Sequence, residues 1–221
     1  MFFKDNSNVY RAGGLSSFSW LVHGFGTQAS GVWPDPWQLI MLKQIHSDIA
    51  VRVDGGRGYV GEGDALYSDR PGVVIGVRTA DCVPILLADP EHRAVAAVHA
   101  GWRGSAAGIV EKTVRRMAEE YGSDPAALHA AIGPAIGGCC YEVGPEVARE
   151  FRAYPEGLSG EGERRHLDLT AVNRKQLGIA RLDPSRIYSG AGCTKCSPGE
   201  FHSYRRDGAR AGRMISAIGV L

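Results

Sequence analysis

The sequence predicts an α+β fold built on mixed or antiparallel β-sheet. Apolar, strand-like segments outnumber segments with helical periodicity, and many of them follow one another directly along the chain. Strands joined by short turns pair antiparallel, whereas parallel pairing needs a long crossover, so this order favours α+β over alternating βαβ units. The 221 residues, 44% of them hydrophobic, are enough for one sizeable globular domain or two small ones.

Each predicted strand is a short apolar run bounded by glycine, proline or charged residues. In chain order, these runs cover residues 19–25, 38–46, 49–53, 73–79, 83–89, 94–100, 128–133, 186–190 and 214–220, and residues 1–18 add a short strand and a turn. The segments between them are polar or rich in glycine and proline. We predict loops at residues 26–37, 54–63, 153–165 and 193–213, and an irregular glycine-rich segment at 133–144.

Helical periodicity occurs in three segments. Residues 105–121 place Ile109, Val114 and Met117 on one face and charged residues on the other, and Gly122 suits the end of such a helix. A second long helix is predicted at 167–182, with Asp168 or Thr170 as its N-cap. A short helix begins at Pro145 and extends to Arg152.

The segment RTADCVPILLADPEHRAVAAVHAGWRG (residues 78–104) carries the main chemical signal. Its strands at 83–89 and 94–100 are joined by a short turn, which predicts an antiparallel hairpin. In such a hairpin the start of one strand lies beside the end of the other. Cys82, just before the first strand, should therefore meet His99, near the end of the second, among the polar and glycine-rich residues that flank both.

His46 resembles Cys82 and His99 in its placement, because it too follows an apolar run and precedes a polar segment. Two imidazoles and one thiolate suit zinc, with a fourth position left for water, which is typical of a catalytic site. Two other interpretations stay open from spacing alone. The three residues could be ordinary core side chains, or Cys82 and His99 could form a metal-free nucleophile–base pair.

The other four cysteines form Cys139-Cys140 and Cys193-x-x-Cys196. A structural four-cysteine zinc site is one interpretation, but adjacent cysteines are a poor match for a second Cys-x-x-Cys pair. We therefore favour buried thiols. Five cysteines, an odd number, indicate thiols or metal ligands in a reducing compartment rather than a disulfide framework.

Arginines in two glycine-containing loops suit a planar anion such as phosphate. Arg103 lies in GWRG, and Arg205 and Arg206 lie in SYRRDG. The alternative for each is ordinary surface charge. Trp102 and Tyr141 could stack against a flat ring or simply pack in the interior.

Composition argues against several classes of protein. The formal net charge is +1, which does not indicate a nucleic-acid partner or an anionic membrane surface. No apolar run reaches the length of about eighteen residues that a membrane span needs. The first residues lack the apolar core of a signal peptide, so we expect a cytoplasmic protein.

Four motifs together resemble the laccase-domain family, also called the multicopper polyphenol oxidase or YfiH-like family, which includes purine nucleoside phosphorylases. They are TADCVPILLAD, VHAGWRG, IGPAIGGCCYEVG and the later CT…FHSYRRDG…GR, in the family's order. The resemblance implies a single domain over residues 1–221. It also implies layered α/β/β/α architecture with mixed sheets, similar to the cytotoxic necrotizing factor cysteine-hydrolase fold.

The resemblance also implies site residues. His46, Cys82 and His99 fall on the family's metal ligands and catalytic residues, and we assign substrate binding to Arg103, Asp81, Arg205 and Tyr141. The expected cofactor is zinc, with copper as the alternative. The expected partners are a purine nucleoside and phosphate, with no nucleic acid, no membrane and a monomeric chain. The segment at 26–37 is shorter than is usual in the family and lacks its arginine.

The resemblance implies phosphorolysis of adenosine, inosine, guanosine or methylthioadenosine, together with adenosine deamination. Alternatives are polyphenol oxidation with bound copper and a Cys–His hydrolase. A multicopper laccase needs many histidines, largely in His-x-His pairs, whereas this chain has seven and no such pair. A non-enzymatic domain with structural zinc is disfavoured by the open coordination position.

Overall fold

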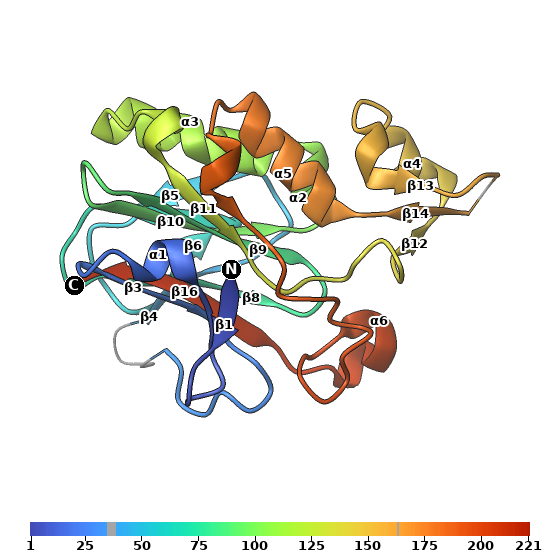
Figure 1. The fold of residues 1–221 in the computed structure, drawn as a ribbon, viewed down its shortest axis with the longest axis horizontal. Coiled ribbons are helices and arrows are strands. Elements are labelled where there is room, and N and C mark those ends of the chain that lie inside the picture. Colours follow the sequence, from blue (N-terminus) through green and yellow to red (C-terminus); the bar gives the residue numbers. More distant parts are fainter. Residues whose placement is uncertain (35–38, 163) are drawn as a thin grey trace.

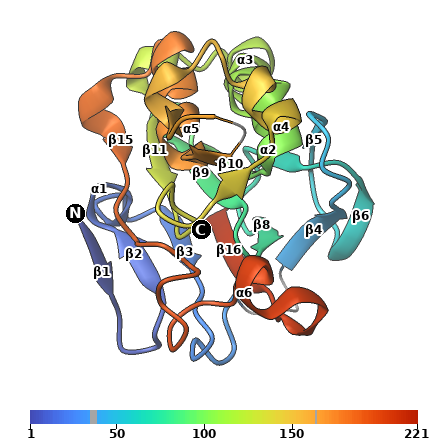
Figure 2. The same cartoon turned by 90° about the vertical axis from the view of Figure 1, so that its right-hand side faces the viewer.

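A computed structural model of the protein describes residues 1–34, 39–162 and 164–221. Two stacked β-sheets form the body of the molecule, and a layer of helices covers the outer face of one of them (Figures 1 and 2). The predicted α+β class with mixed sheets is confirmed. Among the described residues, no helix is long and apolar enough to cross a membrane.

The first sheet contains seven strands in the described chain. Their spatial order is β1 (Phe2–Lys4), β2 (Tyr10–Ala12), β3 (Leu21–Phe25), β16 (Met214–Val220), β8 (Val74–Thr79), β4 (Leu39–Lys43) and β6 (Gly58–Glu62). Strand β4 pairs in parallel with both β8 and β6, while the pairs from β1 to β8 are antiparallel. The sheet is therefore mixed.

The second sheet contains six strands in the described chain. Their spatial order is β15 (Ile187–Tyr188), β11 (His129–Ile132), β9 (Val83–Asp89), β10 (Ala94–Ala100), β7 (Ala65–Ser68) and β5 (Ala50–Arg52). The predicted hairpin is confirmed, since β9 and β10 pair antiparallel with Pro84 opposite His99. Every residue of both strands is buried.

The side chains of β9 alternate between two apolar cores, as the period of two in a strand requires. Val83, Ile85 and Leu87 face the helices, whereas Leu86 and Ala88 face the first sheet. This burial on both faces explains why the strand is apolar throughout rather than alternating. The hairpin is the shared wall of both cores, so its ends are firmly held.

The helix layer differs from the expectation in one respect. Where one helix is predicted at 105–121, the structure has two, α2 (Trp102–Ala106) and α3 (Ile109–Tyr121). Gly108 adopts φ of +72° between them, a left-handed conformation that glycine takes without steric cost and that ends a helix. Helix α5 (Leu169–Ile179) lies beside them, and its N-cap is Asp168, which accepts a 3.0 Å hydrogen bond from the Ala171 amide.

The remaining elements are short. Helix α4 (Pro145–Glu150) packs beside a small sheet of β12 (Glu142–Val143), β14 (Arg165–Leu167) and β13 (Leu158–Ser159). Helices α1 (Gly13–Ser16) and α6 (Tyr204–Asp207) have four residues each. Single 3₁₀ turns lie at Pro125–Ala127, Pro155–Gly157, Pro184–Arg186 and Gly208–Arg210.

The expected fourth layer is not found in the part of the chain that the structure describes. Helices α2, α3 and α5 all lie on the second sheet, and no helix of comparable length covers the outer face of the first (Figure 1). The buried apolar cluster on that outer face is small, and it consists of Leu39, Val74 and Ala217. Such a face does not require a helix to cover it, so the order is α/β/β.

Several predicted loops contain regular structure. The segment 54–63 includes β6, 193–213 includes α6, and 153–165 includes β13. Strand β7 was not predicted at all. Strand β6 is mostly exposed and lies at a sheet edge, so its sequence lacks the apolar pattern by which strands are recognised. The predictions at residues 35–38 and 163 lie outside the described residues.

Candidate functional site

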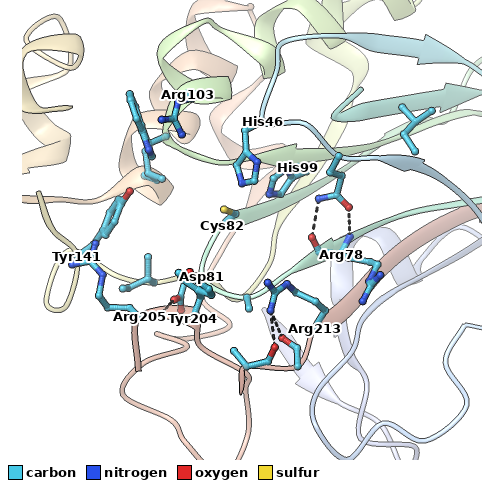
Figure 3. Close-up of a pocket in the computed structure, with 18 of the residues that line it drawn as sticks. His46, Arg78, Asp81, Cys82, His99, Arg103, Tyr141, Tyr204, Arg205 and Arg213 are labelled. Atoms are coloured by element: carbon cyan, nitrogen blue, oxygen red, sulfur yellow. Dashed lines mark hydrogen bonds between the residues drawn. The ribbon is translucent and has the colours of Figure 1, made fainter. Parts of the chain in front are cut away.

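A cavity of about 1120 Å³ opens at one end of the two sheets. Figure 3 shows His46, Cys82 and His99 pointing toward one another within it. We call these three residues the His-Cys-His cluster. Their ligand atoms, the Cys82 sulfur and one nitrogen of each imidazole, all lie within 4.8 Å of one another. The structure thus brings together the three residues that the sequence predicts to converge.

Two members of the cluster come from the β9–β10 hairpin. Cys82 immediately precedes β9, and His99 lies in β10 one position before its end. Gly101 follows, and a β-carbon placed there would lie 3.2 Å from both the Cys82 sulfur and the His46 Cδ2 atom. A residue larger than glycine would therefore crowd the cluster.

His46 approaches from a neighbouring loop, after β4. Its backbone has φ of +59°, and Asp81, beside Cys82, has φ of +88°. Such angles are uncommon for residues other than glycine, and they concentrate where the surrounding structure holds a functional group in place. The two imidazole rings meet edge to face, with ring centroids 5.0 Å apart.

Asp64 holds two of the cluster's three residues, and sequence reasoning missed it. Its buried carboxylate lies 2.8 Å from His99 Nδ1 and accepts hydrogen bonds from the backbone amides of Ile45, His46 and Ser47. The available signal was an aspartate between a glycine and the short apolar run ALYS. That run is β7, which was not recognised as a strand.

Charge interactions in the cluster outweigh burial. Burial alone would raise the pKa of the Cys82 thiol, but hydrogen bonds from His46 and His99 lower it to about 6. Burial alone would lower the pKa of His99, but Asp64 and Cys82 raise it to about 9. The Asp64 pKa falls to about 2, because the hydrogen bonds from His99 and Ser47 exceed the effect of burial. Asp64 is therefore ionised and accepts the Nδ1 proton of His99.

The donor set fits a divalent transition metal. A carboxylate on Nδ1 fixes the imidazole tautomer and leaves the other ring nitrogen of His99 free to act as a ligand. Cys82 favours the thiolate form that a metal requires. Two imidazoles and a thiolate match the ligands of catalytic zinc, and copper is also compatible with them.

Of the four predicted substrate-binding residues, three line the cavity with a guanidinium or an aromatic ring, although Arg205 also donates to the Glu142 carbonyl oxygen. Arg103 lies 4.4 Å from the ring of Trp102, and Arg205 lies 5.0 Å from the ring of Tyr141. Burial raises the pKa of Tyr141 to about 12, so its hydroxyl remains a hydrogen-bond donor. These residues frame one side of the cavity in Figure 3.

Asp81 also lines the cavity, but its carboxylate is engaged within the protein. One oxygen accepts a 2.6 Å bond from the Thr194 hydroxyl, and the other accepts a 2.6 Å bond from the Arg205 amide. This arrangement favours a structural role for Asp81 over direct contact with substrate. Arg206 is likewise structural, because its guanidinium pairs with Asp207 and donates to the carbonyl oxygens of Thr194 and Phe201.

Two further arginines on the opposite side of the cavity were not singled out from the sequence. Arg78 donates to the Tyr59 hydroxyl, and Arg213 donates to two nearby carbonyl oxygens. Within the described residues, neither of them forms an ion pair with a carboxylate, and the same holds for Arg103 and Arg205. The cavity thus has a positively charged rim.

The remaining cysteines contradict the sequence-based preference for buried thiols. Cys139 and Cys196 are exposed and Cys140 and Cys193 are half-buried, and all four sulfur atoms lie within 4.8 Å of one another. The preference failed because it considered local spacing alone. A backbone bridge between Ala135 and Cys193 joins the two segments and brings the sulfurs together. We call this group the four-cysteine cluster.

The chain is similar to a known family over most of its length. A family model described as multi-copper polyphenol oxidoreductase laccase matches residues 27–221. A purine nucleoside phosphorylase from Deinococcus radiodurans is 44% identical over 182 residues, which cover 81% of this chain and 69% of that protein. An adenosine deaminase named RL5, from an unknown prokaryotic organism, is 38% identical over 70% of this chain and 61% of its own.

A solved structure agrees with the fold. The crystal structure of the hypothetical protein YfiH from Bacillus licheniformis superposes with a TM-score of 0.90 at 29% sequence identity. The match covers all of this chain and 99% of that one. The architecture described above is therefore shared along the whole length of the chain.

Proposed function

This chain belongs to the multi-copper polyphenol oxidoreductase laccase family, and we propose that it is a purine nucleoside phosphorylase that also deaminates adenosine. The names of the relatives from Deinococcus radiodurans and of RL5 support these two activities. The observation that carries the proposal is the composition of one cavity, the one of about 1120 Å³. It combines the His-Cys-His cluster with a rim of arginines that have no carboxylate partner among the described residues.

The arginines account for the use of phosphate. Phosphorolysis replaces the glycosidic C1′–N bond with a bond from C1′ to a phosphate oxygen, so phosphate must bind beside the ribose. An arginine guanidinium binds phosphate oxygens through paired, charge-assisted hydrogen bonds. Arg103 is the best placed, because it lies in α2 just after the His99 strand and its guanidinium stacks on the Trp102 ring without a carboxylate partner in the described residues.

The aromatic residues and the His-Cys-His cluster account for the binding and reaction of the nucleoside. Trp102 and Tyr141 line the cavity and offer flat surfaces to a purine ring. Asp64 orients His99, while Gly101 leaves the space in which Cys82 and His46 approach each other. A metal ion bound by the cluster would supply a Lewis acid and a water molecule of lowered pKa. We propose zinc, with copper as the alternative.

The histidines outside the cluster do not support a multicopper oxidase. His23 accepts a bond from the Ala12 amide, His92 contacts Asp89, and His129 contacts the Tyr188 hydroxyl. Within the described residues, the only other group of potential metal ligands consists of cysteines alone. A centre with several coppers therefore lacks the imidazoles that it needs.

The test is a nucleoside assay on protein of known metal content. Adenosine or inosine is supplied with and without phosphate, and the products are separated by chromatography. We expect free base and ribose 1-phosphate only when phosphate is present, and inosine from adenosine in either case. Efficient oxidation of phenols without nucleoside turnover would overturn the proposal. Turnover that survives complete metal removal would favour a Cys–His hydrolase.

Arg103→Ala separates the two activities. Losing charged hydrogen bonds to phosphate should lower kcat/KM for phosphorolysis on the order of tenfold to a hundredfold. Deamination consumes water and no phosphate, so it should be retained. The matched control is Arg115→Ala, which removes an exposed arginine on α3 that is paired with Glu119. If both activities fall together in Arg103→Ala, Arg103 is a general substrate contact.

A further inference from the structure

The four-cysteine cluster has the spacing of a tetrahedral metal site. Four Zn–S bonds of about 2.3 Å place neighbouring sulfurs about 3.8 Å apart. The observed distances are 3.7 Å between Cys139 and Cys196 and 3.3 Å between Cys140 and Cys196, and no pair exceeds 4.8 Å. A disulfide needs about 2.05 Å between sulfurs, and all of these cysteines are free.

One backbone contact near the cluster favours a thiolate at Cys193. The Gly137 amide donates to the Cys193 sulfur at 3.3 Å, an interaction that stabilises negative charge on sulfur. Lys195 lies between the two cysteines of the Cys-x-x-Cys turn, and the Arg206 guanidinium donates to the carbonyl oxygens of Thr194 and Lys195. Arg206 thus holds the backbone of the turn, while its own charge is paired with Asp207. With zinc bound by four thiolates, the group would carry a charge of −2.

We propose that Cys139, Cys140, Cys193 and Cys196 bind a second zinc ion, which is structural. Binding forms four Zn–S bonds and releases the thiol protons to solvent. Four protein ligands fill the tetrahedral coordination and leave no open position for a substrate or water. This inference does not depend on the reaction proposed for the cavity.

The proposed zinc ion joins two segments that carry residues of the cavity wall. Tyr141 directly follows Cys140. Thr194 lies inside the Cys-x-x-Cys turn, and its hydroxyl donates to Asp81, the residue before Cys82. Arg205 then bridges the two segments by donating to the Glu142 carbonyl oxygen at 2.9 Å. The ion therefore positions residues of the cavity without contacting substrate.

The experiment is metal analysis combined with X-ray absorption of zinc-loaded protein. Wild type should contain two zinc ions per chain. The double variant His46→Ala/Cys82→Ser, which dismantles the His-Cys-His cluster, should retain one, and its zinc spectrum should show four sulfur neighbours at about 2.3 Å. Cys193→Ser/Cys196→Ser should lose that ion, whereas Lys195→Ala, within the same turn, should keep it.

A measurement on the wild-type chain covers the case in which the cysteine variants fail to fold. Iodoacetamide labelling, read by peptide mass, should spare Cys139, Cys140, Cys193 and Cys196 in zinc-loaded protein and modify them after zinc is removed. Three results would overturn the proposal. They are no zinc ion in His46→Ala/Cys82→Ser, nitrogen or oxygen neighbours in the remaining site, and a disulfide within the cluster.

Discussion

The two sulfur-containing clusters differ in what supports them. The His-Cys-His cluster lies at the ends of strands that form the wall between both cores, and the buried carboxylate of Asp64 backs it. The four-cysteine cluster lies in loops, and two of its cysteines, Cys139 and Cys196, are exposed. Its two halves are joined by the bridge between Ala135 and Cys193. The fold therefore fixes the positions of the residues in the His-Cys-His cluster. Few contacts from outside the four-cysteine cluster fix the positions of its residues.

This difference indicates different tasks. Three ligands on a rigid frame, facing a large cavity, leave a coordination position where chemistry can occur. Four ligands on loops close the coordination and contribute to folding. Activity should therefore depend mainly on the His-Cys-His cluster, and local stability on the four-cysteine cluster.

The largest expected effect is that of Cys82→Ala on activity. Loss of a residue that supports a metal ligand typically costs about tenfold to a hundredfold in affinity or activity, and loss of a ligand should exceed this. We expect nucleoside turnover to fall by more than about a hundredfold. Circular dichroism should be unchanged, because Cys82 lies at the mouth of the hairpin.

The matched control for that variant is Cys140→Ala, in the four-cysteine cluster. Cys140→Ala should retain most of the activity, while the protein loses zinc from the four-cysteine cluster. Full activity in Cys82→Ala would show that the His-Cys-His cluster is not catalytic.

The next effect in size is that of Asp64→Asn. An amide cannot supply the charge that holds the Nδ1 proton of His99, so metal affinity and kcat should each fall by about tenfold to a hundredfold. Metal titration and steady-state kinetics measure these two quantities. The four-cysteine cluster should keep its ion. A comparable loss of metal from both clusters would mean that Asp64 acts on global stability.

Cys193→Ser/Cys196→Ser should have the smallest effect on catalysis. The variant removes a tether from the wall that carries Tyr141 and Arg205, so KM for the nucleoside should rise severalfold while kcat changes little. Loss of an ion that binds only the folded state should lower Tm on the order of 5 °C. Calorimetry and kinetics on the same sample check both values. A collapse of kcat at unchanged KM would contradict a positioning role.

Sequence patterns predicted those parts of the fold that are locally encoded. The β9–β10 hairpin follows from two apolar runs and a short turn, and it places Cys82 beside His99. The N-cap at Asp168 was one of two candidates, and the structure selects it. The break at Gly108 was missed because the apolar positions that indicated the helix begin at Ile109 and all lie after it.

The missed features depend on contacts that are distant in sequence. Asp64 acts through His99, thirty-five residues away, and through the loop around His46. The four sulfurs meet because Ala135 pairs with Cys193. Neither contact follows from periodicity or spacing, because each depends on how separate segments pack.

The most direct test of the division between the two clusters is stepwise zinc removal from the wild-type chain. A chelator is added in increments, and zinc content, nucleoside phosphorolysis and Tm are measured on the same samples. We expect two ions per chain at the start. Activity should disappear as the ion in the open His-Cys-His cluster leaves, with Tm nearly unchanged, and Tm should fall as the second ion leaves. Activity and Tm that decline together, or a single ion per chain, would contradict this account.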